Sequence, residues 1–226
     1  MNADKLKTVI LLMFAGIALG AWLTPVAAHE GHNHGARAQR SGVSPGHDDV
    51  AGESPAEVKS GNYARSIHVY VVPDVTLVNA NARPIRMREL LAADGPVLLN
   101  FTFTACTAIC PELNREFSRM PAKMGAAPRL RMISVSIDPD NDSPAQLKAY
   151  ARQFGAGANW QFLTGSREDV ETLQRAFDSY HDNKLNPRDA EPLIFLRPGP
   201  GGLWLRINGL ASAEELAREY RNVVQN

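Results

Sequence analysis

The residues with the clearest chemical potential are the only two cysteines of this 226-residue chain, Cys106 and Cys110. Their spacing places both sulfurs on one face of a helix, near enough to form a disulfide or to share a metal ion. Two sulfurs cannot complete a four-ligand zinc site, and a bridge across so short a loop would constrain the unfolded chain very little. We therefore expect thiol–disulfide exchange or binding of a soft metal ion, with a structural bridge as the alternative.

The sequence around the cysteines predicts a strand followed by a helix. VLLNFTF (97–103) is a continuous apolar run typical of a strand buried on both faces, and Pro111 begins a helical pattern that Gly125 ends. The cysteines should then lie at the carboxyl edge of a sheet, where open α/β proteins place their sites. Because the start of a helix stabilises a thiolate, we expect at least one thiol pKa below its free value.

The rest of the chain alternates between strand and helix signals. Helices are predicted after Ser143, Ser166 and Ser212, each of which is followed at the third position by Gln, Asp or Glu, as in a capping box. A Gly-rich joint (198–202) between two apolar runs predicts a hairpin. This order predicts an α/β domain that resembles the thioredoxin-like fold, with a central mixed sheet flanked by helices.

The first 28 residues have the pattern of an export signal. Lys5 and Lys7 precede an uncharged apolar stretch from Thr8 to Ala28, which ends in small residues. The same stretch is long enough to remain as an uncut membrane anchor. In either case we expect the rest of the chain to be periplasmic or otherwise extracytoplasmic.

A histidine-rich segment follows the export signal. His29, His32 and His34, here called the histidine tail, lie within six residues, and neutral imidazoles bind copper, zinc and nickel. Chance enrichment in a soluble tail is the alternative. From residue 35 to 61 there is no aromatic residue, Leu, Ile or Met, so this stretch cannot form a core. We expect residues 29–61 to be a flexible tether and residues 62–226 to be the folded domain.

The balanced net charge argues against nucleic acid as a partner. The chain has 24 basic and 24 acidic residues, whereas a surface that binds nucleic acid needs a basic excess. The acidic run Asp138, Asp140 and Asp142 lacks the Gly and the bidentate Glu of a calcium loop, so we assign it to helix capping and the end of a strand.

Three segments resemble the Sco/SenC family. NFTFTACTAICPE resembles its Cys-x-x-x-Cys-Pro signature, and ISVSIDPDNDSPAQLKAYARQFG resembles its strand, Asp-Pro turn and following helix. PDVTLVNANARPIRMRELL resembles its opening hairpin, an addition at the N-terminal side of the thioredoxin-like domain. The resemblance implies an exported or membrane-tethered protein that binds copper through Cys106, Cys110 and one distant histidine. It also implies a role in assembling the dinuclear copper centre of cytochrome oxidase, and some members act as thiol–disulfide reductases.

This chain departs from the family at the distant histidine. The family has an Asp-His pair just before the last hairpin, and here Asp189 is followed by Ala190, which cannot coordinate a metal. The histidine tail or His181 could supply a ligand instead. His68 falls in a predicted strand and is expected to be packed rather than to bind metal.

Three functions follow from these features. The first is an exported Sco-like protein whose Cys106 and Cys110 bind copper, as Cu(I), and carry out thiol redox for the copper subunit of cytochrome c oxidase or another exported thiol or copper protein. The second is a copper-independent thiol–disulfide oxidoreductase in which Cys106 attacks and Cys110 resolves the mixed disulfide. The third is a metal-collecting protein that binds through the histidine tail.

Overall fold

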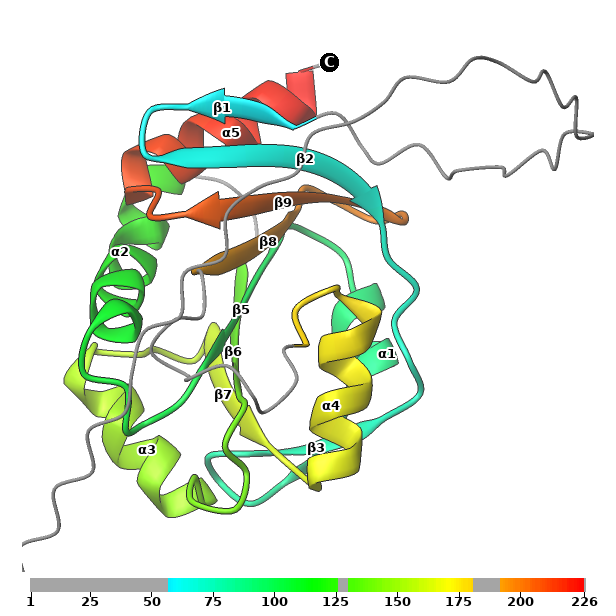
Figure 1. The fold of residues 1–226 in the computed structure, drawn as a ribbon, viewed down its shortest axis with the longest axis vertical. Coiled ribbons are helices and arrows are strands. Elements are labelled where there is room, and N and C mark those ends of the chain that lie inside the picture. Colours follow the sequence, from blue (N-terminus) through cyan, green and yellow to red (C-terminus); the bar gives the residue numbers. More distant parts are fainter. Residues whose placement is uncertain (1–56, 126–129, 181–191, 226) are drawn as a thin grey trace, which may run out of the picture. The chain divides into compact units, whose positions relative to one another are not determined.

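A mixed β-sheet forms the centre of the computed structural model, which describes residues 57–125, 130–180 and 192–225. Its strands have the spatial order β1-β2-β9-β8-β5-β6-β7-β3-β4 (Figure 1). β5 pairs in parallel with β6 and β6 with β7, and the other pairings in this part of the chain are antiparallel. The predicted mixed sheet with a parallel centre is confirmed.

The described strands and helices have these bounds. The strands are β1 Val58–Ser60, β2 Tyr63–Val69, β3 Thr76–Asn79, β4 Pro84–Arg86, β5 Val97–Thr102, β6 Arg131–Ser136, β7 Trp160–Thr164, β8 Leu193–Arg197 and β9 Leu203–Gly209. The helices are α1 Met87–Ala92, α2 Ile109–Met124, α3 Pro144–Gln153, α4 Arg167–Ala176 and α5 Ala213–Gln225. From β5 onward this is the predicted order, and β3 and β4 form the predicted opening hairpin.

Two apolar clusters lie on opposite faces of the sheet. One joins the sheet to α2, α3 and α5, and the other joins the opposite face to α1 and α4 (Figure 1). Leu98 belongs to the first cluster and Leu99 to the second, because successive side chains of a strand point to opposite faces. This explains why β5 reads as a continuous apolar run.

Side-chain caps begin three of the helices, as predicted. Ser143 and Gln146 form a capping box at α3, and the Ser166 side chain accepts a bond from the Asp169 backbone at α4. Before α5, Glu215 Oε2 accepts from the Ser212 backbone N–H at 2.8 Å. Each bond satisfies an N–H that the first helical turn leaves unpaired.

The structure revises the predicted start of the folded domain. β1 lies in residues predicted to be tether, and it pairs with β2 in antiparallel register. The folded part therefore includes residues 58–60 rather than beginning at 62. Among the helices that the structure describes, none has the length and apolarity needed to cross a bilayer. The apolar stretch at Thr8–Ala28 and the histidine tail lie outside the described residues.

Candidate functional site

Cys106 and Cys110 lie where β5 gives way to α2, as the sequence predicted. Cys106 is partly exposed in the connecting loop, and Cys110 is 6% exposed in the first turn of α2. Both thiols are free, and the backbone N–H of Cys110 donates to Cys106 Sγ at 3.3 Å. The helix start thus holds the first sulfur beside the second, and only the first is open to a partner.

The expected lowering of a thiol pKa does not occur at Cys110. Burial, the hydrogen bond with Cys106 and the charge of Cys106 together raise the pKa of the Cys110 thiol to about 12. The Thr102 side chain and the Phe103 backbone oppose this shift without overcoming it. The helix N-terminus favours a lower thiol pKa, but the burial of the second cysteine outweighs it, and this burial is not visible in the local sequence. Cys110 is therefore held as a neutral thiol near neutral pH.

A buried carboxylate fixes the loop that carries Cys106. Asp142 is 0% exposed, and it accepts bonds from the Thr104 N–H at 3.1 Å and from the Thr104 hydroxyl at 2.5 Å. The Ser136 hydroxyl, at the end of β6, donates to the same carboxylate at 2.5 Å. The assignment of Asp142 to helix capping and the end of a strand did not include these bonds to Thr104 and Ser136. Its place directly before the capping Ser143, at the end of a buried strand, was the signal available in the sequence.

A chain of buried hydrogen bonds runs from Tyr150 into the core. Asn114 donates to the Tyr150 hydroxyl at 3.1 Å, and Asn100 donates to Asn114 at 3.4 Å. The Ser134 hydroxyl donates to Asn100 at 2.6 Å and accepts from the Trp160 indole at 2.9 Å. Since Tyr150 uses its oxygen as an acceptor here, its own proton is free to donate. Tyr150 lies on the helix predicted after Ser143, but nothing in the sequence pattern identifies this network.

Thr102 is an unusual neighbour of the buried cysteine. Its hydroxyl is buried and makes no hydrogen bond of good geometry with the described residues. It nevertheless lies near enough to lower the pKa of both Cys110 and Tyr150, although burial raises the pKa of Tyr150 to about 12. An unpartnered hydroxyl beside a thiol can donate to that sulfur when it becomes a thiolate.

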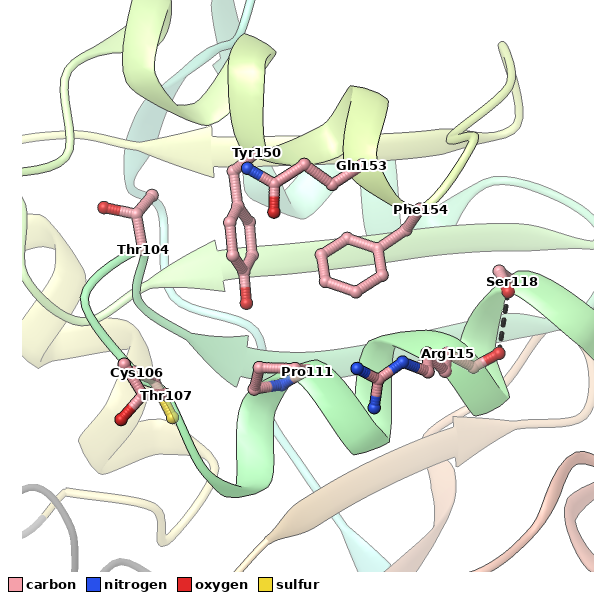
Figure 2. A pocket seen from close by; sticks show the side chains of 9 residues that line it. All are labelled: Thr104, Cys106, Thr107, Pro111, Arg115, Ser118, Tyr150, Gln153 and Phe154. Carbon is pink, nitrogen blue, oxygen red and sulfur yellow. Dashed lines mark hydrogen bonds between the residues drawn. The ribbon is translucent and has the colours of Figure 1, made fainter.

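A cavity of about 580 Å³ opens beside Cys106, between α2 and α3. Figure 2 shows the rings of Tyr150 and Phe154 pointing from α3 toward α2, with Pro111 and Arg115 on the opposite side. Arg115 is the one charged residue among the described residues that line this cavity. The accessible cysteine therefore lies at the mouth of a groove with an aromatic wall and a single cation.

Of the predicted metal ligands, only Cys106 and Cys110 lie among the residues that the structure describes. Across residues 57–125, 130–180 and 192–225, no group of three or more His, Cys, Asp or Glu side chains could hold a metal ion. The histidine tail, His181 and Ala190 lie outside these ranges. His68 is packed, as expected: it stacks on Tyr70 with ring centroids 5.2 Å apart and bonds to the Ser66 hydroxyl at 2.8 Å. Burial and the charge of Arg206 lower its pKa.

The fold and the site define a thioredoxin-like α/β protein with a free Cys-x-x-x-Cys pair between a central strand and its following helix. The family model described as SCO1/SenC matches residues 67–225, and the chain belongs to that family. The family and fold predictions are thus confirmed.

Relatives and solved structures agree with this membership. The SCO1 protein homolog of Bacillus subtilis (strain 168) is 32% identical over 145 residues, which cover 61% of this chain and 72% of the relative. The structure of BsSco, a Sco-family cytochrome c oxidase assembly protein with a disulfide switch, is 27% identical with a TM-score of 0.57, covering 70% of this chain and 95% of that one. Yeast Sco1 with copper bound has the same fold, at 21% identity and a TM-score of 0.56, over 70% of this chain and 95% of that one.

Proposed function

We propose that this protein binds copper through Cys106 and Cys110 and uses the same pair for thiol redox during assembly of the copper centre of cytochrome c oxidase. The observation that carries the proposal is the pairing of two free sulfurs at the start of α2, one accessible and one buried. Family membership supports the biological role, since BsSco is an oxidase assembly protein and yeast Sco1 binds copper.

The donor set of the site suits copper as a cargo. Two thiolates are soft ligands that favour Cu(I), and the described residues supply these two sulfurs and no third metal ligand. Because burial keeps Cys110 protonated, copper binding must displace its proton. The histidine tail is the proposed source of a further ligand, in place of the family histidine whose position Ala190 occupies.

The same pair can reduce a disulfide of a partner. The Cys106 thiolate attacks one partner sulfur, and the other partner sulfur leaves as a thiolate. Cys110 then attacks Cys106 Sγ, which closes the protein disulfide and releases the second partner thiolate. Two electrons pass to the partner, and the two protons of the protein thiols pass to the partner thiolates. The exposure of Cys106 favours it as the attacking cysteine, and the burial of Cys110 favours it as the resolving one. The same assignment would hold for a copper-independent oxidoreductase.

The proposed setting is extracytoplasmic. Residues 1–28 would act as a signal peptide or membrane anchor, and the following residues to about 57 would tether the folded domain. The proposed partner is the copper subunit of cytochrome c oxidase or another exported thiol or copper protein. Cell fractionation with protease protection tests this placement, and a protein found in the cytosol would contradict it.

Copper retention by the reduced full chain under a competing Cu(I) chelator separates the three functions. One equivalent that is lost in Cys110→Ala, and that is only weakened when the histidine tail is replaced by alanines, supports copper handling by the cysteines with a further ligand from the tail. Retention lost only with the histidine tail supports the metal-collecting function. No retention, together with a measurable thiol reduction potential, supports the copper-independent oxidoreductase. The full chain is required because β1 lies before residue 62.

A further inference from the structure

The groove between α2 and α3 extends beyond the reach of the two cysteines. It begins at Cys106 and continues past Arg115 to Ser118. We propose that this groove binds the extended segment next to the cysteine of the partner protein, with an acidic side chain of that segment paired to Arg115. The inference rests on the proposed reaction of Cys106 with a partner, and it adds the chemistry by which the partner is recognised.

The wall of the groove suits an apolar side chain of such a segment. Tyr150 and Phe154 present their rings from α3, and Pro111 presents its ring from α2 (Figure 2). Phe154 and Pro111 are only partly buried, so they keep apolar surface open to a ligand. Burying that surface under an aliphatic side chain of the partner is favourable.

The charge of the groove selects an acidic group. Arg115 contributes its one charge, and no carboxylate is among the described residues that line it. Arg115 is paired with Glu112 on the surface, where the two side chains are 53% and 60% exposed. Exposed pairs of this kind contribute little, so exchanging Glu112 for a carboxylate of the partner costs little.

Distances along the helix set where the acidic residue should lie. Pro111 and Arg115 are four residues apart on α2, which is about 6 Å of helical rise. An extended chain advances about 3.3 Å per residue. The partner's cysteine meets Cys106 before Pro111, so the acidic residue is expected at least two positions from that cysteine. At the edge of the groove, the exposed Gln153 amide offers both a donor and an acceptor to the backbone of the segment.

Disulfide exchange with model peptides tests this recognition in the full chain. The probes are symmetric disulfides of acetyl-Ala-Cys-Leu-Asp-Ala-amide and of its Asn counterpart, together with the pair in reversed order. For at least one order we expect the reduced protein to react about five-fold faster with the Asp peptide at low salt, as a partly exposed charge pair allows. Arg115→Gln should bring the ratio to about one. Arg119→Gln is the matched control, since Arg119 forms the same type of i,i+3 pair with Glu116 and does not line the groove.

Two results would overturn the groove. One is a ratio of exchange rates for the Asp and Asn peptides that Arg115→Gln leaves unchanged. The other is an equal fall of this ratio in Arg119→Gln, which would show that the overall charge of the protein, and not the groove, causes the preference. Bis(2-hydroxyethyl) disulfide, which is uncharged and has no such segment, should react equally with all three proteins. If the protein exchanges with this small disulfide but shows no preference between peptides, the groove fails and the proposed redox function stands.

The same peptides with Ser in place of Cys cannot exchange disulfides, so their binding tests the groove independently of the proposed redox function. Titration followed by the NMR signal of the Gln153 side chain should show saturable binding of the Asp peptide that Arg115→Gln weakens. Such binding in a protein that exchanges with no disulfide keeps the groove and overturns the redox function. Peptide binding that is lost as the protein self-associates at higher concentration would assign the groove to a second copy and overturn the proposal.

Discussion

The carboxylate of Asp142 accepts both the backbone N–H and the hydroxyl of Thr104, and so ties the turn before α3 to the loop that carries Cys106. The loop follows β5, while Asp142 follows β6, its parallel neighbour in the sheet. The position of the accessible sulfur therefore depends on a buried carboxylate 36 residues further along the chain.

Replacing Asp142 should disturb both stability and the cysteine loop. Asp142→Ala leaves the Thr104 and Ser136 donors without their acceptor, and we expect a loss of about 2–4 kcal/mol in the free energy of unfolding. Asp140→Ala is the matched control, because Asp140 is 64% exposed and pairs with Arg167 only at the surface; its effect should be below about 0.5 kcal/mol. Urea unfolding measures both, and equal effects would refute the anchoring role.

The two cysteines should react with alkylating agents at different rates. At pH 8 iodoacetamide should modify Cys106 first, because Cys110 is buried and its pKa is raised to about 12. Cys106→Ser should speed labelling of Cys110, since the hydrogen bond and the charge of Cys106 contribute to the raised pKa. Labelling should still remain slower than for a free thiol, because burial is the largest cause. Mass spectrometry of the labelled peptides checks this, and preferential labelling of Cys110 in the unmodified protein would contradict it.

Alkaline pH should destabilise the fold through three buried acids. The pKa of Cys110 rises from 9.0 to about 12, and those of Tyr70 and Tyr150 rise from 10.0 to about 12. Groups with a raised folded pKa stabilise the protein fully below the unfolded value, and that stabilisation is lost as pH rises through the folded value. The free energy of unfolding should therefore decline from about pH 9 to 12, by up to about 1.4 kcal/mol per pH unit for each group.

Cys110→Ala separates the thiol from the tyrosines in this decline. Between about pH 9 and 10 only the thiol of these three contributes, so the decline should be absent there in the variant; from about pH 10 to 12 the variant should still decline less steeply than the unmodified protein, because only the two tyrosines then contribute. Urea unfolding at a series of pH values is the measurement. An unchanged slope between pH 9 and 10 would show that Cys110 does not titrate as its burial requires.

Variants of Thr102 and Tyr150 should differ in what they change: one should shift the pKa of Cys110, and the other should lower the stability of the fold. Thr102→Val removes a hydroxyl that has no good partner, so stability should be unchanged or slightly higher, while the pKa of Cys110 should rise further. Tyr150→Phe leaves the buried Asn114 amide without its acceptor and should cost about 1–2 kcal/mol. Thermal unfolding and the pH dependence of Cys110 labelling measure the two effects, and a clear loss of stability in Thr102→Val would mean that its hydroxyl is bonded.

The sequence predicted those parts of the structure that depend on local patterns. The apolar run of β5, the capping serines and the Gly-rich hairpin each set their own element, and the order of elements then restricts the sheet topology. The place of the cysteine pair between a strand and a helix was also predicted, because the spacing of the pair and its position after a strand are visible along the chain. The burial of Cys110, the bonds of Asp142 to Thr104 and the network from Tyr150 to Trp160 were missed. These depend on contacts between distant segments, and so does the pairing of β1 with β2.

The most direct test of the central claim is the X-ray absorption spectrum at the copper edge of the full chain loaded with Cu(I). Two sulfur scatterers are expected from Cys106 and Cys110, and both should disappear when the two cysteines are replaced by serine. A spectrum with only nitrogen and oxygen neighbours in the unmodified protein would show that the cysteine pair does not hold the metal.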